Sequence, residues 1–303
     1  MTAGVTKASA PPADPTPMPG DVVLVTALWI QVFAACIYGW RFGEYYDYGW
    51  YVPPLTLLFA YRLRGLFPTA APLHGWIWLS AGLLLTALLT VLRVVGRVDP
   101  RWTLPLWIQA AVVLAVTLWV ARRRGGTPAA RRLIPVLLFA CTAIPLPSVL
   151  EKMAVTTLTD SVISSSAVLL GWLGRPVEAI GDQLGRLGEV VHVTEGCSGI
   201  RSAQSFLMVS LFFGEWMSLR ARNRWLMVGA GLLTAWTLNV IRASALAWIR
   251  FEHGEAAFGK AHDVAGLLAF AAGSATLLGI SKALDRGASP RRISRQVVEG
   301  GVA

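Results

Sequence analysis

Residues 225–249 read WLMVGAGLLTAWTLNVIRASALAWI, an apolar stretch with a single charged residue, Arg242. A helix rises about 1.5 Å per residue, so a stretch of this length can cross the roughly 30 Å hydrocarbon core of a bilayer. Tryptophans near both of its ends suit the two membrane interfaces. The stretch therefore predicts a transmembrane helix.

The rest of the chain has the same character on both sides of this stretch. The protein has 303 residues, of which 55% are hydrophobic and 15% charged, and its mean hydropathy is +0.56. A soluble domain carries about 25% charged residues, so the composition excludes one. We predict an all-α polytopic membrane helix bundle of about eight transmembrane helices. Besides 225–249, these comprise residues 22–40, 50–66, 76–95, 102–121, 133–150, 200–219 and 264–284.

The net charge of +10 has an explanation in this membrane topology. Lys and Arg gather in the cytoplasmic loops of membrane proteins, whereas a basic soluble protein would suggest nucleic acid. A cytoplasmic N-terminus places most of the Lys and Arg residues inside, and an even number of spans then places both termini there. We therefore expect no nucleic-acid partner. The expected parts are a mobile N-terminal tail (1–20), a membrane domain (21–284) and a basic cytoplasmic tail (285–303) held to anionic membrane lipid.

A long extracytoplasmic segment, residues 151–199, separates the fifth and sixth predicted spans. Its first part, 153–173, mixes Ser and Thr with apolar residues, which suits a helix lying in the membrane interface. Its second part contains the alternating run VVHVT at 190–194, which favours a short strand or hairpin. Loops of this length are usually functional or disordered, and this one contains too many apolar residues for disorder.

One cysteine stands apart from the other two. Cys36 and Cys141 lie in apolar runs, where thiols usually serve as packing, and the three cysteines form no metal-site spacing. Cys197 lies between Gly196 and Gly199, at the expected N-terminus of a helix, where the helix dipole favours a thiolate. The alternative is that Cys197 is merely a small residue at a helix start.

Two further groups are expected on the same outer side of the membrane. Arg242 lies within a span, with Asn239 one turn away on the same helix face, and His262 lies at the outer start of the last span. Cys, His and a cation are the minimum for thiol acyl transfer. Arg242 could instead be a snorkelling or ion-paired residue and His262 an interfacial anchor, and His253 is a substitute base.

The motifs around these residues match a known family. Residues 195–201 read EGCSGIR, 239–242 read NVIR, 143–147 read AIPLP and 47–53 read DYGWYVP, with His262 following at the last span. In this order, from about residue 40 to 284, the chain resembles the exosortase and archaeosortase family, which are multi-pass bacterial and archaeal cysteine transpeptidases. The resemblance implies that Cys197 is the nucleophile, Arg242 an essential arginine and His262 the third catalytic residue. Gly196 departs from the alanine expected in the motif.

The same resemblance implies the substrates and the cellular place. Such enzymes cleave exported proteins that end in a short motif such as Pro-Glu-Pro, a transmembrane helix and a basic end, and transfer some of them to a cell-surface acceptor. The chain is expected in the bacterial inner membrane with its active site facing outward, and without a metal or organic cofactor. The residues expected to support the site are Arg201, Ser198, Asn239, Glu195 and Asp263.

Two other functions are compatible with the residues. In a transporter or channel, Arg201, Arg242 and Glu215 would line a hydrophilic path. In a non-enzymatic component of surface-polymer export, Cys197 would be dispensable. The two alternatives differ from the enzyme in the role they give to the thiol.

Overall fold

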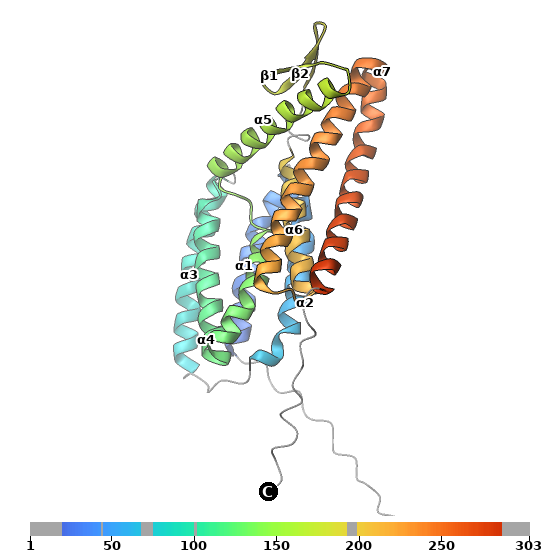
Figure 1. The fold of residues 1–303 in the computed structure, drawn as a ribbon. Coiled ribbons are helices and arrows are strands. Elements are labelled where there is room, and N and C mark those ends of the chain that lie inside the picture. The colour runs from blue at the N-terminus through green and yellow to red at the C-terminus, as the bar shows by residue number, and fades with distance from the viewer. Residues whose placement is uncertain (1–19, 44, 68–74, 100–101, 193–198, 287–303) are drawn as a thin grey trace, which may run out of the picture.

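A computed structural model describes residues 20–43, 45–67, 75–99, 102–192 and 199–286. Its fold is a bundle of long helices with a small antiparallel sheet at one end (Figure 1). In chain order the elements are α1 (Gly20–Phe42), the 3-10 helix η1 (Asp47–Tyr51), α2 (Val52–Arg62), η2 (Arg64–Leu66), α3 (Gly75–Val98), α4 (Leu104–Cys141), α5 (Ser148–Trp172), β1 (Glu178–Ile180), β2 (Gln183–Arg186), β3 (Glu189–His192), α6 (Ile200–Trp216) and α7 (Ala221–Arg286).

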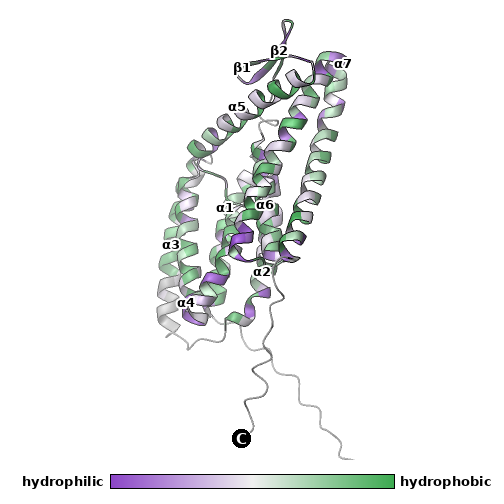
Figure 2. Ribbon diagram, viewed as in Figure 1, coloured by the Kyte–Doolittle hydropathy of each residue, from purple (hydrophilic) through white to green (hydrophobic). Residues whose placement is uncertain are grey.

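Five described helical segments are long and apolar enough to cross a membrane. They leave large apolar side chains on the outside of the bundle, where Leu233 and Leu267 of α7 are 63% and 71% exposed. Hydrophobic residues colour most of the length of these helices, whereas hydrophilic residues gather at the sheet (Figure 2). Lipid-facing leucines are expected of a membrane helix. The chain is a multi-pass membrane protein, and the count of about eight spans stays a prediction. The five segments are Gly20–Phe42, Leu104–Cys141, Ser148–Trp172, Ala221–His262 and Val264–Asp285.

Two of the long helices, α4 and α7, are helical hairpins. Each is broken at one glycine of positive φ, Gly126 (72°) in α4 and Gly254 (76°) in α7. The ends of α7 meet, since Asn223 Nδ2 donates to the carbonyl of Leu284 at 3.1 Å. The predicted spans 102–121 and 133–150 thus lie on the two arms of α4, and 225–249 and 264–284 on those of α7. The loops expected at 122–132 and 250–263 are wrong, because helix continues up to a single glycine that reverses the chain.

Two predicted spans are shorter than expected. The segment 50–66 contains the helix α2, whose 11 residues rise only about 17 Å, between two 3-10 helices. The predicted span 133–150 ends as a helix at Cys141, and a new helix begins at Ser148. The two prolines of the AIPLP run explain this end, since proline lacks an N–H and restricts the residue before it.

The predicted extracytoplasmic segment 151–199 is mostly regular structure. The helix α5 occupies its first part and runs obliquely towards the tip of α7 (Figure 1). The strand predicted at 190–194 is confirmed as far as His192 by β3, which pairs with β2 in the order β1-β2-β3. The length of α5 would also allow it to cross a membrane, so its interfacial position stays a prediction.

The sheet is fixed to the tip of α7. Leu184 of β2 is fully buried in a cluster with Leu170 of α5 and Leu246 of α7. Arg175 and Arg186 both bind the carboxylate of Glu252, Arg186 at 2.9 Å. The segment that leads from β3 to α6 therefore starts from a surface attached to the hairpin.

Candidate active site

The two arms of α7 meet at a pair of predicted site residues. Nη2 of Arg242 lies 3.1 Å from Nε2 of His262. A guanidinium can only donate hydrogen bonds, so this contact is a hydrogen bond in the tautomer of His262 whose Nε2 carries no proton. The second arm begins as a helix directly after Gly254, so His262 lies about two turns into it, and the part of this arm that is apolar enough to cross a membrane begins two residues later, at Val264. The two side chains are thus in contact, and their depth in the membrane stays a prediction.

The first arm of α7 also contacts the residue that precedes α6. Gly199 has a φ of 88°, and a Cβ on it would lie 2.8 Å from Nδ2 of Asn239. Asn239 is almost fully buried, at 2% exposure. Both the backbone conformation and the contact require glycine at position 199. The end of the EGCSGIR motif therefore packs against the NVIR motif.

A second glycine lies against the arginine. A Cβ on Gly266 would lie 3.7 Å from Nη2 and 3.8 Å from Cζ of Arg242. This is ordinary van der Waals contact, so the hydrogen side chain of Gly266 leaves room beside the guanidinium. The charged group of Arg242 thus lies against the second arm, beside both His262 and Gly266, which are one helical turn apart.

Arg201 lies at the start of α6 near a different motif. Its Nη2 is 4.0 Å from Oδ2 of Asp47, and its side chain is 52% exposed. The helix α6 begins at Ile200, directly after Gly199 in its left-handed conformation, so Arg201 lies in the first turn of α6. The contact with Asp47 links the EGCSGIR motif to the DYGWYVP motif.

The DYGWYVP and AIPLP motifs are joined by hydrogen bonds. Tyr48 Oη donates to the carbonyl of Thr142 at 2.9 Å, and Tyr46 Oη accepts from the backbone N–H of Leu146 at 2.7 Å. Tyr46 also donates to Oε2 of Glu151 at 2.6 Å. Burial, and then this bond to Glu151, raise the pKa of the Tyr46 phenol above its usual range. Sequence reasoning missed Tyr46 and Glu151. The sequence feature that could have indicated Glu151 is its position as an acidic residue shortly after the AIPLP run.

Several predicted residues cannot be placed in this arrangement. Glu195, Cys197 and Ser198 lie outside the described residues, and the side chain of Asp263 is not described. His253 is exposed at the tip of the hairpin, 11 residues or about 16 Å along the arm from Arg242. It is therefore separated from the Arg242–His262 pair, and His262 is the histidine that accompanies the arginine.

The fold and the paired motifs define a multi-pass helical membrane protein with a polar centre between the arms of its last hairpin. The sequence model of the transmembrane exosortase family (Exosortase_EpsH) matches residues 40–279, which is most of the chain. The chain belongs to this family, and membership implies exosortase-type sorting of exported proteins. No curated protein and no solved structure gives a significant match.

Proposed function

We propose that the protein is a membrane cysteine endopeptidase and transpeptidase that removes the C-terminal sorting tail of exported proteins. The observation that carries this proposal is the 3.1 Å contact between Arg242 and His262, next to the chain that leads to Cys197. A base and a cation that lie together, beside a tethered thiol, are the parts that thiol acyl transfer needs. The substrate is a chain with a short motif, a transmembrane helix and a basic end.

The length of the chain supports a thiol within reach of this pair. Consecutive Cα atoms are 3.8 Å apart, so Cys197 lies no more than about 7.6 Å from Gly199 by Cα distance. Gly199 is against Asn239, and Asn239 is three residues, about 4.5 Å of helical rise, from Arg242. A flexible cysteine side chain and a long arginine side chain can bridge the remaining gap.

In the proposed reaction Arg242 acts first and His262 acts second. In the free site the lone pair of His262 Nε2 is occupied by Arg242. When the scissile carbonyl of a substrate arrives, Arg242 turns to its oxygen, and the released Nε2 takes the proton of the Cys197 thiol. The thiolate sulfur then bonds to the carbonyl carbon, with Arg242 stabilising the oxyanion.

The tetrahedral intermediate collapses with cleavage of the amide C–N bond. His262 returns its proton to the leaving amine, which departs with the substrate's transmembrane tail. The remaining thioester on Cys197 is attacked by water or by a nucleophilic group of a cell-surface acceptor, which gives hydrolysis or transfer. Asn239, and Ser198 and Glu195 beside the nucleophile, are proposed to orient these groups.

The depth of the site agrees with a reaction at the outer membrane surface. Arg242 is 17 residues, or about 25 Å of helical rise, from Trp225 at the start of the first arm of α7. If Trp225 marks the inner interface, Arg242 lies near the outer boundary of a roughly 30 Å core. With both termini in the cytoplasm, the tail of an exported protein would meet Cys197 after its export.

The transporter alternative requires a continuous charged path. Glu215 lies near the end of α6, where its carboxylate binds Arg224 and is 3.8 Å from Nη2 of Arg132. Arg201 lies 14 residues earlier, about 21 Å away by helical rise, and contacts Asp47. The charges are thus engaged at opposite ends of α6, which favours the enzyme.

The test is co-expression with a tagged protein from the same genome that ends in a motif, a helix and a basic tail. The mass of this cargo is compared for the wild type, Cys197→Ala and the control Cys141→Ala. We expect loss of the tail with the wild type and the control but not with Cys197→Ala. The mass of the new terminus distinguishes water from another nucleophile, and processing by the Cys197→Ala protein would refute the proposed nucleophile.

A further inference from the structure

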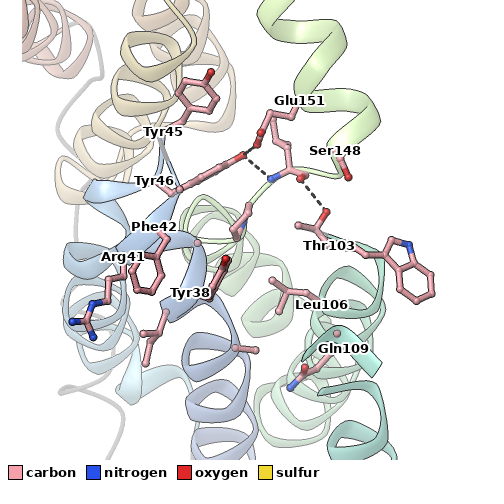
Figure 3. Close-up of a pocket in the computed structure, with 18 of the residues that line it drawn as sticks. Tyr38, Arg41, Phe42, Tyr45, Tyr46, Thr103, Leu106, Gln109, Ser148 and Glu151 are labelled. Carbon is pink, nitrogen blue, oxygen red and sulfur yellow. Dashed lines mark hydrogen bonds between the residues drawn. The ribbon is translucent and has the colours of Figure 1, made fainter. Parts of the chain in front are cut away.

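A separate pocket of about 1080 Å³ lies where the end of α1 meets the starts of α4 and α5 (Figure 3). Its walls come from the last turns of α1 and α3, the first turns of α4, and the segment that leads from the AIPLP motif into α5. Arg242, His262 and Asn239 do not line it, so it is distinct from the proposed active site. Tyr46 lies in its wall.

A buried amide lies in an apolar part of this pocket. Gln109 of α4 is 1% exposed, and its Nε2 has no hydrogen-bond partner among the described residues. Apolar side chains such as Leu106 and Ala35 line the same part. A buried N–H without an acceptor is costly, so the position favours a ligand that brings a carbonyl or ester oxygen to Nε2.

The rim of the pocket is positively charged. Arg41, Arg93 and Lys152 line it, together with a single carboxylate, that of Glu151. The carboxylate already accepts a hydrogen bond from Tyr46 at 2.6 Å. Three cations against one carboxylate leave a net positive charge in the lining, so an anionic group is the complementary ligand.

The cations and the amide come from different walls of the pocket. Arg41 lies in the last turn of α1 and Arg93 near the end of α3, whereas Gln109 lies in the first turns of α4. A ligand that reaches both therefore needs an anionic group and a separate hydrogen-bond acceptor.

We propose that this pocket is a binding site for a glycerophospholipid. The phosphate binds Arg41 and Arg93, an ester carbonyl accepts a hydrogen bond from Gln109 Nε2, and the acyl chains follow the apolar outer sides of α1 and α3. Exposed Ile37 and Tyr38 of α1 extend this apolar surface out of the pocket. Apolar chains with an anionic head at a cationic membrane interface match this order of groups.

The test uses the purified full-length protein in detergent and native mass spectrometry with three probes. The probes are dioleoyl phosphatidylglycerol, its diether analogue, and dioleoylglycerol, which lacks the phosphate. We expect the wild type to prefer phosphatidylglycerol over both. The Arg41→Gln, Arg93→Gln double variant should bind it about tenfold more weakly, while the control Lys260→Gln, at an exposed residue outside the pocket, should not change.

A second variant tests the amide. Gln109→Leu should lose the several-fold preference for phosphatidylglycerol over its diether analogue. It should keep the preference for phosphatidylglycerol over dioleoylglycerol, which lacks the phosphate. Binding of phosphatidylglycerol at wild-type strength by the arginine double variant would overturn the proposal. A second result would also overturn it: the arginine double variant binds phosphatidylglycerol as the wild type does but no longer processes cargo. The pocket would then hold the cargo tail instead of a lipid.

Discussion

Nη2 of Arg242 and Nε2 of His262 are 3.1 Å apart although the residues are twenty positions apart in the chain. The contact exists because Gly254 reverses the helix and sets the two arms in one register. A shift of one residue in either arm would rotate a side chain by about 100° around the helix axis. The geometry of the proposed base and cation is thus determined by the turn of the hairpin.

Replacement of Arg242 by lysine tests the proposed role of the guanidinium. Lysine keeps the positive charge but has a compact ammonium in place of the planar fork that can reach both His262 and a carbonyl oxygen. We expect cargo processing to fall about 100-fold or more, as when an oxyanion donor is removed. The rate of tail removal in membranes measures this. Arg250→Lys, near the tip of the same arm, is the matched control, and equal activity of both variants would contradict the role.

Replacement of Gly199 by alanine tests the contact between the nucleophile motif and α7. The φ of 88° and the 2.8 Å approach to Asn239 Nδ2 both oppose a Cβ. We expect a cost of about 1–3 kcal/mol and a loss of cargo processing. Gly171→Ala in α5, where a Cβ would meet nothing within 4 Å, is the control. If Asn239→Ala restores part of the activity of Gly199→Ala, the steric contact contributes, whereas an unaffected Gly199→Ala protein would refute the contact.

A pair of glycines in α7 tests the turn of the hairpin. Gly254 has a φ of 76°, whereas Gly259 has no positive φ, and a Cβ on either would meet nothing within 4 Å. Gly254→Ala is therefore expected to lower stability by about 1 kcal/mol or more through the backbone alone. Gly259→Ala should raise it by up to about 1 kcal/mol. Thermal unfolding in detergent measures both, and a change of the same sign in both would exclude a strained turn at Gly254.

The sequence could predict which residues gather but not how closely. Apolar length and loop charge predict Arg242 and His262 at similar depth on one side, and in the structure the two side chains are in contact. The same reasoning turned 250–263 into a loop, since this segment is rich in charged residues. A helix that extends beyond the bilayer exposes its charged side chains to water just as a loop does. Composition alone therefore does not show where such a helix ends.

Contacts between distant motifs lie beyond local patterns. Tyr46 and Glu151 are 105 positions apart, and neither has a spacing that relates it to the other. The regular helix within the span expected at 50–66 is shorter than expected for a similar reason, because the average hydropathy of a window does not register that α2 ends at Arg62. Packing between segments, which decides both, is set only when the bundle forms.

The hydrogen bonds of Tyr46 give a prediction for the link between the two proline-containing motifs. Tyr46→Phe removes the acceptor of the Leu146 N–H and the donor to Glu151. Unsatisfied buried groups cost about 1–3 kcal/mol, so the variant should be less stable by that amount at neutral pH. Tyr51→Phe is the control, because the side chain of Tyr51 is 66% exposed.

The stability difference between the wild type and Tyr46→Phe should depend on pH. Burial and Glu151 raise the pKa of Tyr46 in the folded protein above the value near 10 of an unfolded tyrosine. A raised pKa gives a stabilisation that is complete below about pH 10 and is lost at higher pH, because the unfolded chain releases its proton first. Thermal unfolding from pH 7 to 11 should show a constant difference up to about pH 9 and a smaller one above pH 10. A difference that grows with pH would mean that Tyr46 is not the protonated donor in this network.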